Sequence, residues 1–288
     1  MKTGCGGITW NSFTRQNNVE ISQEQSPSAI AQAGYEGAPF SIRDERPAEE
    51  IVASLAKYGL KPAPGYLGAT YWERDREHEI LEQARKAARL SQQVGCTEMY
   101  VAASPLTRRE ASGHVCPEDA LPHEAYRQLA RALNRVGEIC LGYGVRICFH
   151  NHVGSVVETR EEIDRLFELV NRALVFQGPD IGHLAWAGAD VVQFCRDYAD
   201  DIISMHVKDI DPDVRKQGVA QAWDYGTFSR RGIFAELGEG FVDFPAVLEI
   251  LEDVGYEGWV IVETDVTQKA TPLESAVISR DYLKSIGL

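Results

Sequence analysis

The sequence lacks the features that would tie it to a membrane or to a redox site. No window approaches the roughly 20 apolar residues of a membrane span, and the first residues, MKTGCGGITW, lack the apolar run of a signal peptide. The six cysteines form no CxxC or CxxxxC pair, which argues against a zinc knuckle or a thioredoxin-like motif. We therefore expect a soluble, cytoplasmic protein without a membrane partner.

Positive charge is also scarce. Lys and Arg together number 29 against 43 Asp and Glu, which gives a formal net charge of -14. The densest basic stretches are the pairs Arg108–Arg109 and Arg230–Arg231, too little to overcome the repulsion of a phosphate backbone. Nucleic acid is excluded as a partner, and a small molecule is expected instead.

No Ser-, Gly- or Pro-rich linker divides the chain, so a single domain over residues 1–288 is expected. Helical apolar spacing recurs, most clearly at 49–59, 78–95, 125–144, 160–170 and 244–255. Short apolar segments that predict strands lie between or after these helices, at 99–103, 145–150, 202–207 and 259–263. Their continuous apolar character is typical of parallel strands that are covered on both faces. With further strands near 4–10 and 173–180, about eight strand–helix pairs result.

Glycines mark the helix ends that lead into these strands, at Gly34, Gly59, Gly95, Gly144 and Gly255. Eight units predict an α/β fold of the (β/α)8 TIM-barrel type. A doubly wound open sheet is the alternative, but it would carry a Gly-rich nucleotide loop after its first strand, where this chain has GCGGITW within the strand.

Polar side chains gather at the predicted carboxyl ends of four successive strands, where barrel active sites lie. They are His150, Asn151, His152, Asp180, His183, His206, Lys208, Asp209, Glu263 and Asp265. Any one of them could be structural, since a strand-end Asp often caps the next helix. Together, imidazole and carboxylate groups predict a site for a borderline divalent cation, which would also relieve the repulsion among the carboxylates.

At these residues the sequence resembles the sugar phosphate isomerase/epimerase superfamily of xylose isomerase-like TIM barrels. The motifs that carry the resemblance span nearly the whole chain: GITWNS, GYEG, FHNHVGSVVETREEIDRL, PDIGHLAWAGAD, HVKDI and GIFAELGEGFVDFPAVLEILEDVGYEGWVIVETD. Within the superfamily they are most similar to those of the inosose dehydratase subgroup, which removes water from 2-keto-myo-inositol.

The resemblance implies one divalent metal ion, Mn²⁺ or Co²⁺ before Zn²⁺, Fe²⁺ or Mg²⁺. The positions that match the ligands of the superfamily are Glu158, Asp180, His206 and Glu263. His150 stands where many members have the first Glu, so His150 is the alternative to Glu158. We expect substrate contacts from His183, Asp209 and Trp10.

Such a metal can polarise a ketone so that a base removes the neighbouring proton to give an enediolate. Loss of a β-hydroxyl then gives a dehydratase that acts on a polyhydroxylated ketone, which is the predicted function. We expect His152 to be the acid for that hydroxyl, and His150, Lys208, Glu158 and Glu263 to complete the catalytic set.

Three alternatives stay open: a metal-dependent sugar isomerase or epimerase, for which Glu158 and Glu263 would act as paired bases, a 3-keto-glycoside lyase, and a barrel that binds sugar without catalysis. The sequence also leaves open whether the protein forms a homo-oligomer.

Overall fold

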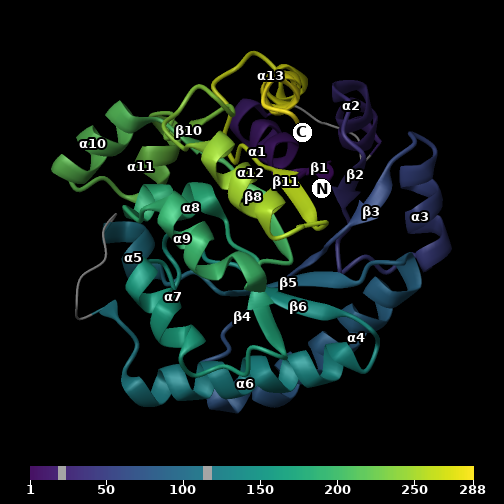
Figure 1. Ribbon diagram of the computed structural model, residues 1–288, viewed down its shortest axis with the longest axis vertical. Coiled ribbons are helices and arrows are strands. Elements are labelled where there is room, and N and C mark those ends of the chain that lie inside the picture. Colours follow the sequence, from purple (N-terminus) through teal and green to yellow (C-terminus); the bar gives the residue numbers. More distant parts are fainter. Residues whose placement is uncertain (19–23, 113–118) are drawn as a thin grey trace.

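The computed structural model describes residues 1–18, 24–112 and 119–288, and it is built around short parallel strands (Figure 1). The strands that line the centre are β1 (Lys2–Cys5), β2 (Gly37–Pro39), β3 (Lys61–Ala63), β4 (Tyr66–Ala69), β5 (Glu98–Ala103), β6 (Arg146–Phe149), β7 (Val175–Gln177), β8 (Ser204–Val207) and β11 (Trp259–Val262). Two shorter strands, β9 (Asp209–Ile210) and β10 (Phe234–Ala235), pair antiparallel outside this set.

The central strands close into a barrel. They form two parallel sheets, in the orders β3-β2-β1-β11-β8 and β4-β5-β6-β7. The chain joins the sheets directly from β3 to β4, and the bridges Gln177 to Ile202 and Asp180 to His206 join β7 to β8. With β3 and β4 counted as two halves of one strand, the described residues give the eight strands that were predicted, and the open doubly wound sheet is wrong.

Helices surround the barrel. They are α1 (Ile8–Asn17), α2 (Gln25–Ala33), α3 (Ala48–Ala56), α4 (Glu77–Val94), α5 (Thr107–Ser112), α6 (His123–Leu141), α7 (Arg160–Phe167), α8 (Ile181–Ala187), α9 (Val191–Tyr198), α10 (Pro212–Ala220), α11 (Tyr225–Arg230), α12 (Phe244–Asp253) and α13 (Pro272–Ser285). Short 3-10 turns occur at Arg74–Arg76 and Ala199–Asp201. The five glycines predicted to end helices all have positive φ, between 66° and 92°.

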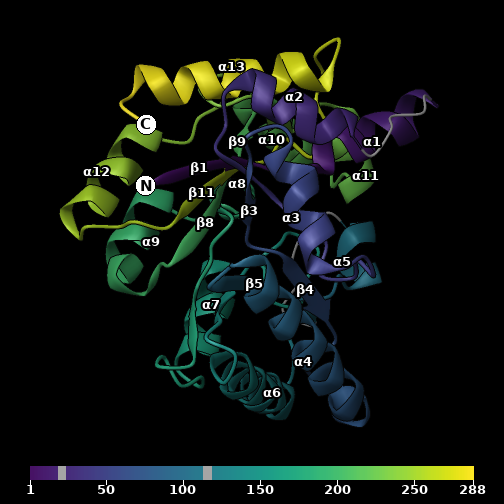
Figure 2. The same cartoon turned by 90° about the vertical axis from the view of Figure 1, so that its right-hand side faces the viewer.

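Neighbouring helices pack against one another around the strands. The longest two, α4 and α6, lie side by side along one face, while α13 lies against α1 and α2 on the opposite side (Figure 2). One continuous core of buried apolar side chains lies between the helices and the strands, with Met99, Val101, Ile147 and Phe149 among its strand residues. The five described cysteines are buried and form no disulfide with one another, and Cys116 lies outside the described residues.

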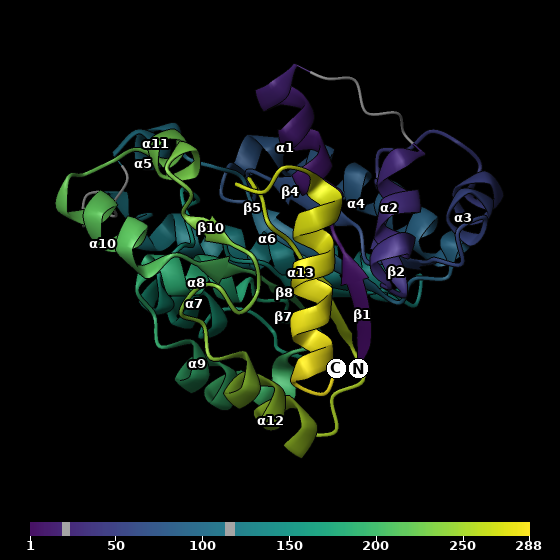
Figure 3. The ribbon, with the colours of Figure 1, turned by 90° about the horizontal axis from the view of Figure 1, so that it is seen from above.

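An insertion between β8 and α12 extends the barrel at one edge. It contains the β9–β10 pair and the helices α10 and α11, and α11 lies against α5 (Figure 3). The two ends of the chain lie next to each other (Figures 1 and 3). None of the described helices is long and apolar enough to cross a membrane.

Candidate active site

The site lies where β6, β7, β8 and β11 end, and local bonds fix its backbone. The side-chain amide of Asn151 makes two hydrogen bonds of 3.1 Å to the backbone of Asp180: it donates to the carbonyl and accepts from the N–H. These bonds connect the end of β6 to the end of β7. Asp180 is the N-cap of α8, and its Oδ1 accepts the N–H of His183 at 3.0 Å. One oxygen of Asp180 thus caps a helix, and Oδ2 is left to face the site.

Three buried side chains at these ends can hold a metal ion together. His150, Asp180 and His206 each offer an atom within 4.8 Å of the other two. Glu263 adjoins the group, with its Oε2 3.1 Å from His206 Nδ1. Asp180 Oδ2 faces the Lys208 ammonium at 3.1 Å, but among the described residues it makes no hydrogen bond of regular geometry, and neither do His150 Nδ1 and the two His206 nitrogens. Buried polar atoms without hydrogen bonds are costly, and a divalent ion would satisfy Asp180 Oδ2 and one nitrogen of each histidine.

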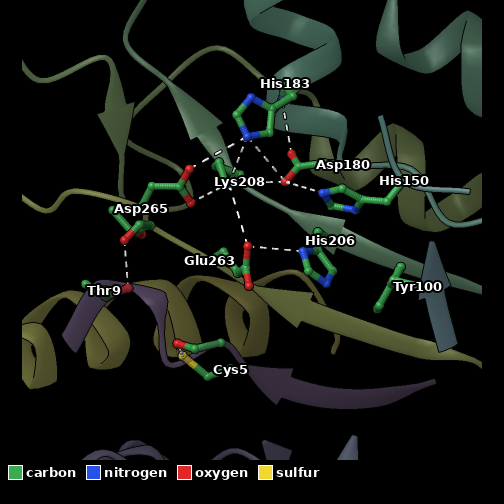
Figure 4. Close-up of polar contacts among 12 residues, drawn as sticks. Cys5, Thr9, Tyr100, His150, Asp180, His183, His206, Lys208, Glu263 and Asp265 are labelled. Atoms are coloured by element: carbon green, nitrogen blue, oxygen red, sulfur yellow. Dashed lines mark hydrogen bonds and ion pairs between the residues drawn. The ribbon is translucent and has the colours of Figure 1, made fainter. Parts of the chain in front are cut away.

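The ammonium group of Lys208 is at the centre of the polar contacts (Figure 4). Its Nζ lies 2.5 Å from Asp265 Oδ1, 3.1 Å from Asp180 Oδ2 and 3.7 Å from Glu263 Oε2. Burial alone would lower the pKa of Lys208, but these carboxylates outweigh it and hold that pKa well above its ordinary value. Lys208 is therefore a permanent cation of the site.

A second group, His152, His183 and Asp265, also has ligand atoms within 4.8 Å of one another. It adjoins the first group, since His183 Nε2 lies 4.0 Å from Asp180 Oδ2. His152 Nδ1 is 2.6 Å from the carbonyl of Val153. A carbonyl only accepts, so Nδ1 carries the proton and Nε2 keeps a lone pair. Burial, and then His183, lower the pKa of His152 to about 3, so its imidazole is neutral.

The remaining predicted residues lie outside these two groups. The Glu158 carboxylate accepts the N–H of Gly154 at 2.7 Å, and burial raises its pKa to about 7. Both oxygens of Asp209 accept backbone N–H groups, from Ile210, Gly238, Gly240 and Val242. Asp209, which we expected to contact substrate, therefore holds the loop around residues 238–242.

Trp10 is buried in α1 and lines a cleft of about 1370 Å³ together with Gly7, Ser41 and Arg43. Gly7 is next to Gly6, and a Cβ at Gly6 would lie 2.4 Å from Glu263 Oε1. The cleft therefore runs close to the Glu263 end of the site, while Trp10 has no ring contact with any of the site histidines.

Aromatic residues that the sequence analysis did not single out border the histidines. The rings of Tyr66 and Tyr100 lie edge-on to His150, at 5.3 and 5.6 Å between centroids, and Tyr225 stacks on His152 at 5.9 Å. Tyr66 is 42% exposed, so a ligand can reach it. No strand-end signal marks these residues, because Tyr66 begins a strand and Tyr225 begins a helix of the insertion.

A model of the family described as xylose isomerase-like TIM barrel matches residues 27–286. The chain belongs to this family. An inosose dehydratase of Geobacillus kaustophilus (strain HTA426) is 31% identical over 292 residues, which covers 98% of this chain and 93% of that protein. A rhizopine catabolism protein MocC of Rhizobium meliloti is also 31% identical, over 98% of this chain and 87% of its own length.

Solved structures show the same barrel. The IolI protein with a bound zinc atom superposes with a TM-score of 0.74 over 99% of this chain and 98% of its own, at 16% identity. The predicted resemblance to the sugar phosphate isomerase/epimerase barrels is confirmed, and this chain is an enzyme of that family.

Proposed function

We propose that this enzyme is a divalent-metal-dependent carbon–oxygen lyase that removes water from a cyclic polyhydroxylated ketone of the 2-keto-myo-inositol type. The observation that carries the proposal is the convergence of three buried side chains, His150, Asp180 and His206, beside the partly exposed Glu263. Among the described residues, Asp180 Oδ2 and both His206 nitrogens lack a hydrogen bond of regular geometry. The inosose dehydratase of Geobacillus kaustophilus, 31% identical over 98% of this chain, favours a cyclitol ketone over other polyols.

The four residues that would hold the ion are His150, Asp180, His206 and Glu263. Two imidazoles and two carboxylates suit Mn²⁺ and Co²⁺, and also Zn²⁺ or Fe²⁺. His150 replaces Glu158 in this set, because His150 belongs to the buried group and the carboxylate of Glu158 does not. When bound, the ion would polarise the ketone and stabilise negative charge that develops on its oxygen.

The proton transfers fall to the second group. His152 keeps a lone pair on Nε2 and lies beside His183 and Asp265, and a neutral imidazole there can take the substrate's α-proton. His152 then carries that proton and can deliver it to the β-hydroxyl as it leaves. This assignment modifies the sequence-based one, in which His152 acts only as an acid, because His152 Nδ1 faces the Val153 carbonyl and leaves a lone pair on Nε2.

Lys208 and His183 would orient the substrate. Lys208 Nζ also lies 3.3 Å from His183 Nε2, so the two side chains share one polar surface next to the proposed ligands. Side chains of Glu263 and Asp265 keep 17% and 12% exposure, respectively, whereas those of Asp180 and His183 have none. Substrate would therefore reach the site from the end of β11.

The alternative reactions differ in their catalytic groups. An epimerase needs two bases on opposite faces of the substrate, and the pair suggested by the sequence was Glu158 and Glu263. The Glu158 carboxylate is bonded to Gly154 instead and belongs to neither group, which favours elimination. A 3-keto-glycoside lyase would use the same elimination with an alcohol as the leaving group, so only the substrate separates it from the proposal.

A substrate panel with Mn²⁺ or Co²⁺ tests the proposal. We expect the enzyme to remove one water molecule from 2-keto-myo-inositol, which mass spectrometry and proton NMR would detect. Chelation of the metal should abolish this activity. Asp180→Asn should lose both activity and metal, and His78→Gln, at an exposed position on α4, serves as the matched control. Full activity after exhaustive chelation, or turnover of ketoses with proton exchange but never release of water or an alcohol, would refute it.

A further inference from the structure

Lys208 contacts two adjoining groups of metal-ligating side chains. The first is His150, Asp180 and His206, and the second is His152, His183 and Asp265. The ammonium is 3.1 Å from Asp180 Oδ2 in the first group, and 2.5 Å from Asp265 Oδ1 and 3.3 Å from His183 Nε2 in the second. The ammonium thus contacts two of the three side chains of the second group and one of the first.

The atoms of the second group are prepared for a cation. An ammonium only donates, so the 3.3 Å contact between Lys208 Nζ and His183 Nε2 is a hydrogen bond in the tautomer that leaves a lone pair on this nitrogen. His183 is fully buried, and its other nitrogen, Nδ1, has no hydrogen-bond partner among the described residues. Since His152 Nδ1 is engaged with Val153, His152 also presents a lone pair at Nε2. Two imidazole nitrogens and one carboxylate are a donor set that suits Zn²⁺ or Co²⁺.

The packing around Lys208 holds its ammonium in that place. The side chain is 1% exposed, and Nζ lies 5.4 Å from the centre of the Phe234 ring, a cation–π distance. Helix α8 approaches the Lys208 backbone so closely that a Cβ on Gly182 would lie 2.5 Å from the Cβ of Lys208. The chain therefore directs this side chain into the space between the two groups.

We propose that Lys208 occupies a second cation site formed by His152, His183 and Asp265, and thereby limits the enzyme to one divalent ion. The inference rests on the proposed metal centre at His150, Asp180, His206 and Glu263. An ion held by Asp265 and His183 would lie directly against the ammonium, and two positive charges so close in a buried site exclude each other. Replacement of the ammonium by an uncharged group opens the second site to a divalent cation.

The charges of the site agree with a single ion. Asp180, Glu263 and Asp265 contribute three negative charges, and Lys208 contributes one positive charge. One divalent ion brings this set to neutrality, whereas two divalent ions beside a retained ammonium would leave two positive charges without compensation. The exclusion also keeps His152 and His183 free for substrate, which the proposed elimination requires.

Metal counting tests the inference without reference to activity. Metal-free wild type, Lys208→Met and Lys208→Arg are titrated with Co²⁺, and bound ions per chain are counted by equilibrium dialysis with mass-spectrometric metal analysis. We expect one ion for the wild type and for Lys208→Arg, which keeps the charge, and two for Lys208→Met. The double variant Lys208→Met with Asp265→Asn should return to one ion, because it lacks the carboxylate of the second group.

The outcomes are separable. A wild type that binds two ions overturns the inference, and this result does not depend on whether a variant folds. A folded Lys208→Met protein that saturates at one ion also overturns the inference. If circular dichroism shows that Lys208→Met does not fold, Lys208→Gln is the second uncharged variant for the same measurement. A wild type that binds no ion refutes the metal centre of the proposed function itself, which is a different result from one ion in every variant.

Discussion

Replacement of Glu158 by Gln should stabilise the protein at neutral and alkaline pH while leaving its metal content unchanged. Burial raises the pKa of Glu158 from 4.5 to about 7. A raised pKa in the folded state means that the folded protein disfavours the ionised form. The contribution of this carboxyl to stability is therefore fully present below pH 4.5, and it is lost as the pH rises through about 7.

The size of the effect follows from the two pKa values. At roughly 1.4 kcal/mol per pKa unit, ionised Glu158 destabilises the fold by about 3 kcal/mol at pH 8, relative to the protonated form. Gln has nearly the same shape and keeps an oxygen for the Gly154 N–H, which now lies 2.7 Å from Oε2. We expect Glu158→Gln to match the wild type at pH 4.5 and to gain up to about 3 kcal/mol by pH 8.

Urea unfolding of the metal-free proteins across this pH range measures the difference. Glu161→Gln, at an exposed position at the start of α7, controls for the loss of one negative charge. A Glu158→Gln protein with an unchanged pH dependence would show that the burial argument is wrong. A Glu158→Gln protein that no longer retains its metal ion would make Glu158 a ligand, as the sequence pattern suggested, and would remove His150 from that place.

Two further predictions concern residues on either side of the metal group. His152→Asn should lower the rates of elimination and of α-proton exchange with solvent deuterium by about 10²- to 10⁴-fold, because the neutral imidazole takes that proton. The metal content should stay unchanged. If exchange is retained while elimination is lost, His152 acts only as the acid. Asp209→Ala should lower the free energy of unfolding, measured in urea titrations, by about 2–4 kcal/mol, because four backbone N–H groups lose their acceptor. A decrease below about 0.5 kcal/mol would mean that water replaces the carboxylate as acceptor.

The barrel could be predicted from the sequence because its signals are local and repeated. Helix ends at glycine, such as Gly95 and Gly144, precede the apolar strands β5 and β6 at nearly the predicted residues. The break within one barrel strand, between β3 and β4, was not predicted, although it coincides with Pro64, which lacks the N–H of a strand ladder, and with Gly65. A Cβ there would lie 3.0 Å from the carbonyl oxygen of Phe40.

The site was predictable where side chains alternate along a strand, and less so in loops. His206 and Lys208 are two residues apart and face the same space, whereas Asp209, one residue further, faces the loop that it holds. The same alternation, applied from His206, predicts that Asp209 points away from the space that His206 and Lys208 face. Glu158 follows a loop of several residues, and the position of its carboxylate depends on the Gly154 N–H, which spacing along the chain does not reveal.

The charge balance links the buried histidines to the need for a cation. Three carboxylates at Asp180, Glu263 and Asp265 meet a single ammonium at Lys208, so the described site carries two uncompensated negative charges. Burial lowers the pKa values of His150 and His152 well below their ordinary values, so these two imidazoles add no compensation. A divalent cation would supply the charge that the site lacks. Neutral His150 then keeps a lone pair for the ion, and neutral His152 keeps one to accept a proton from the substrate.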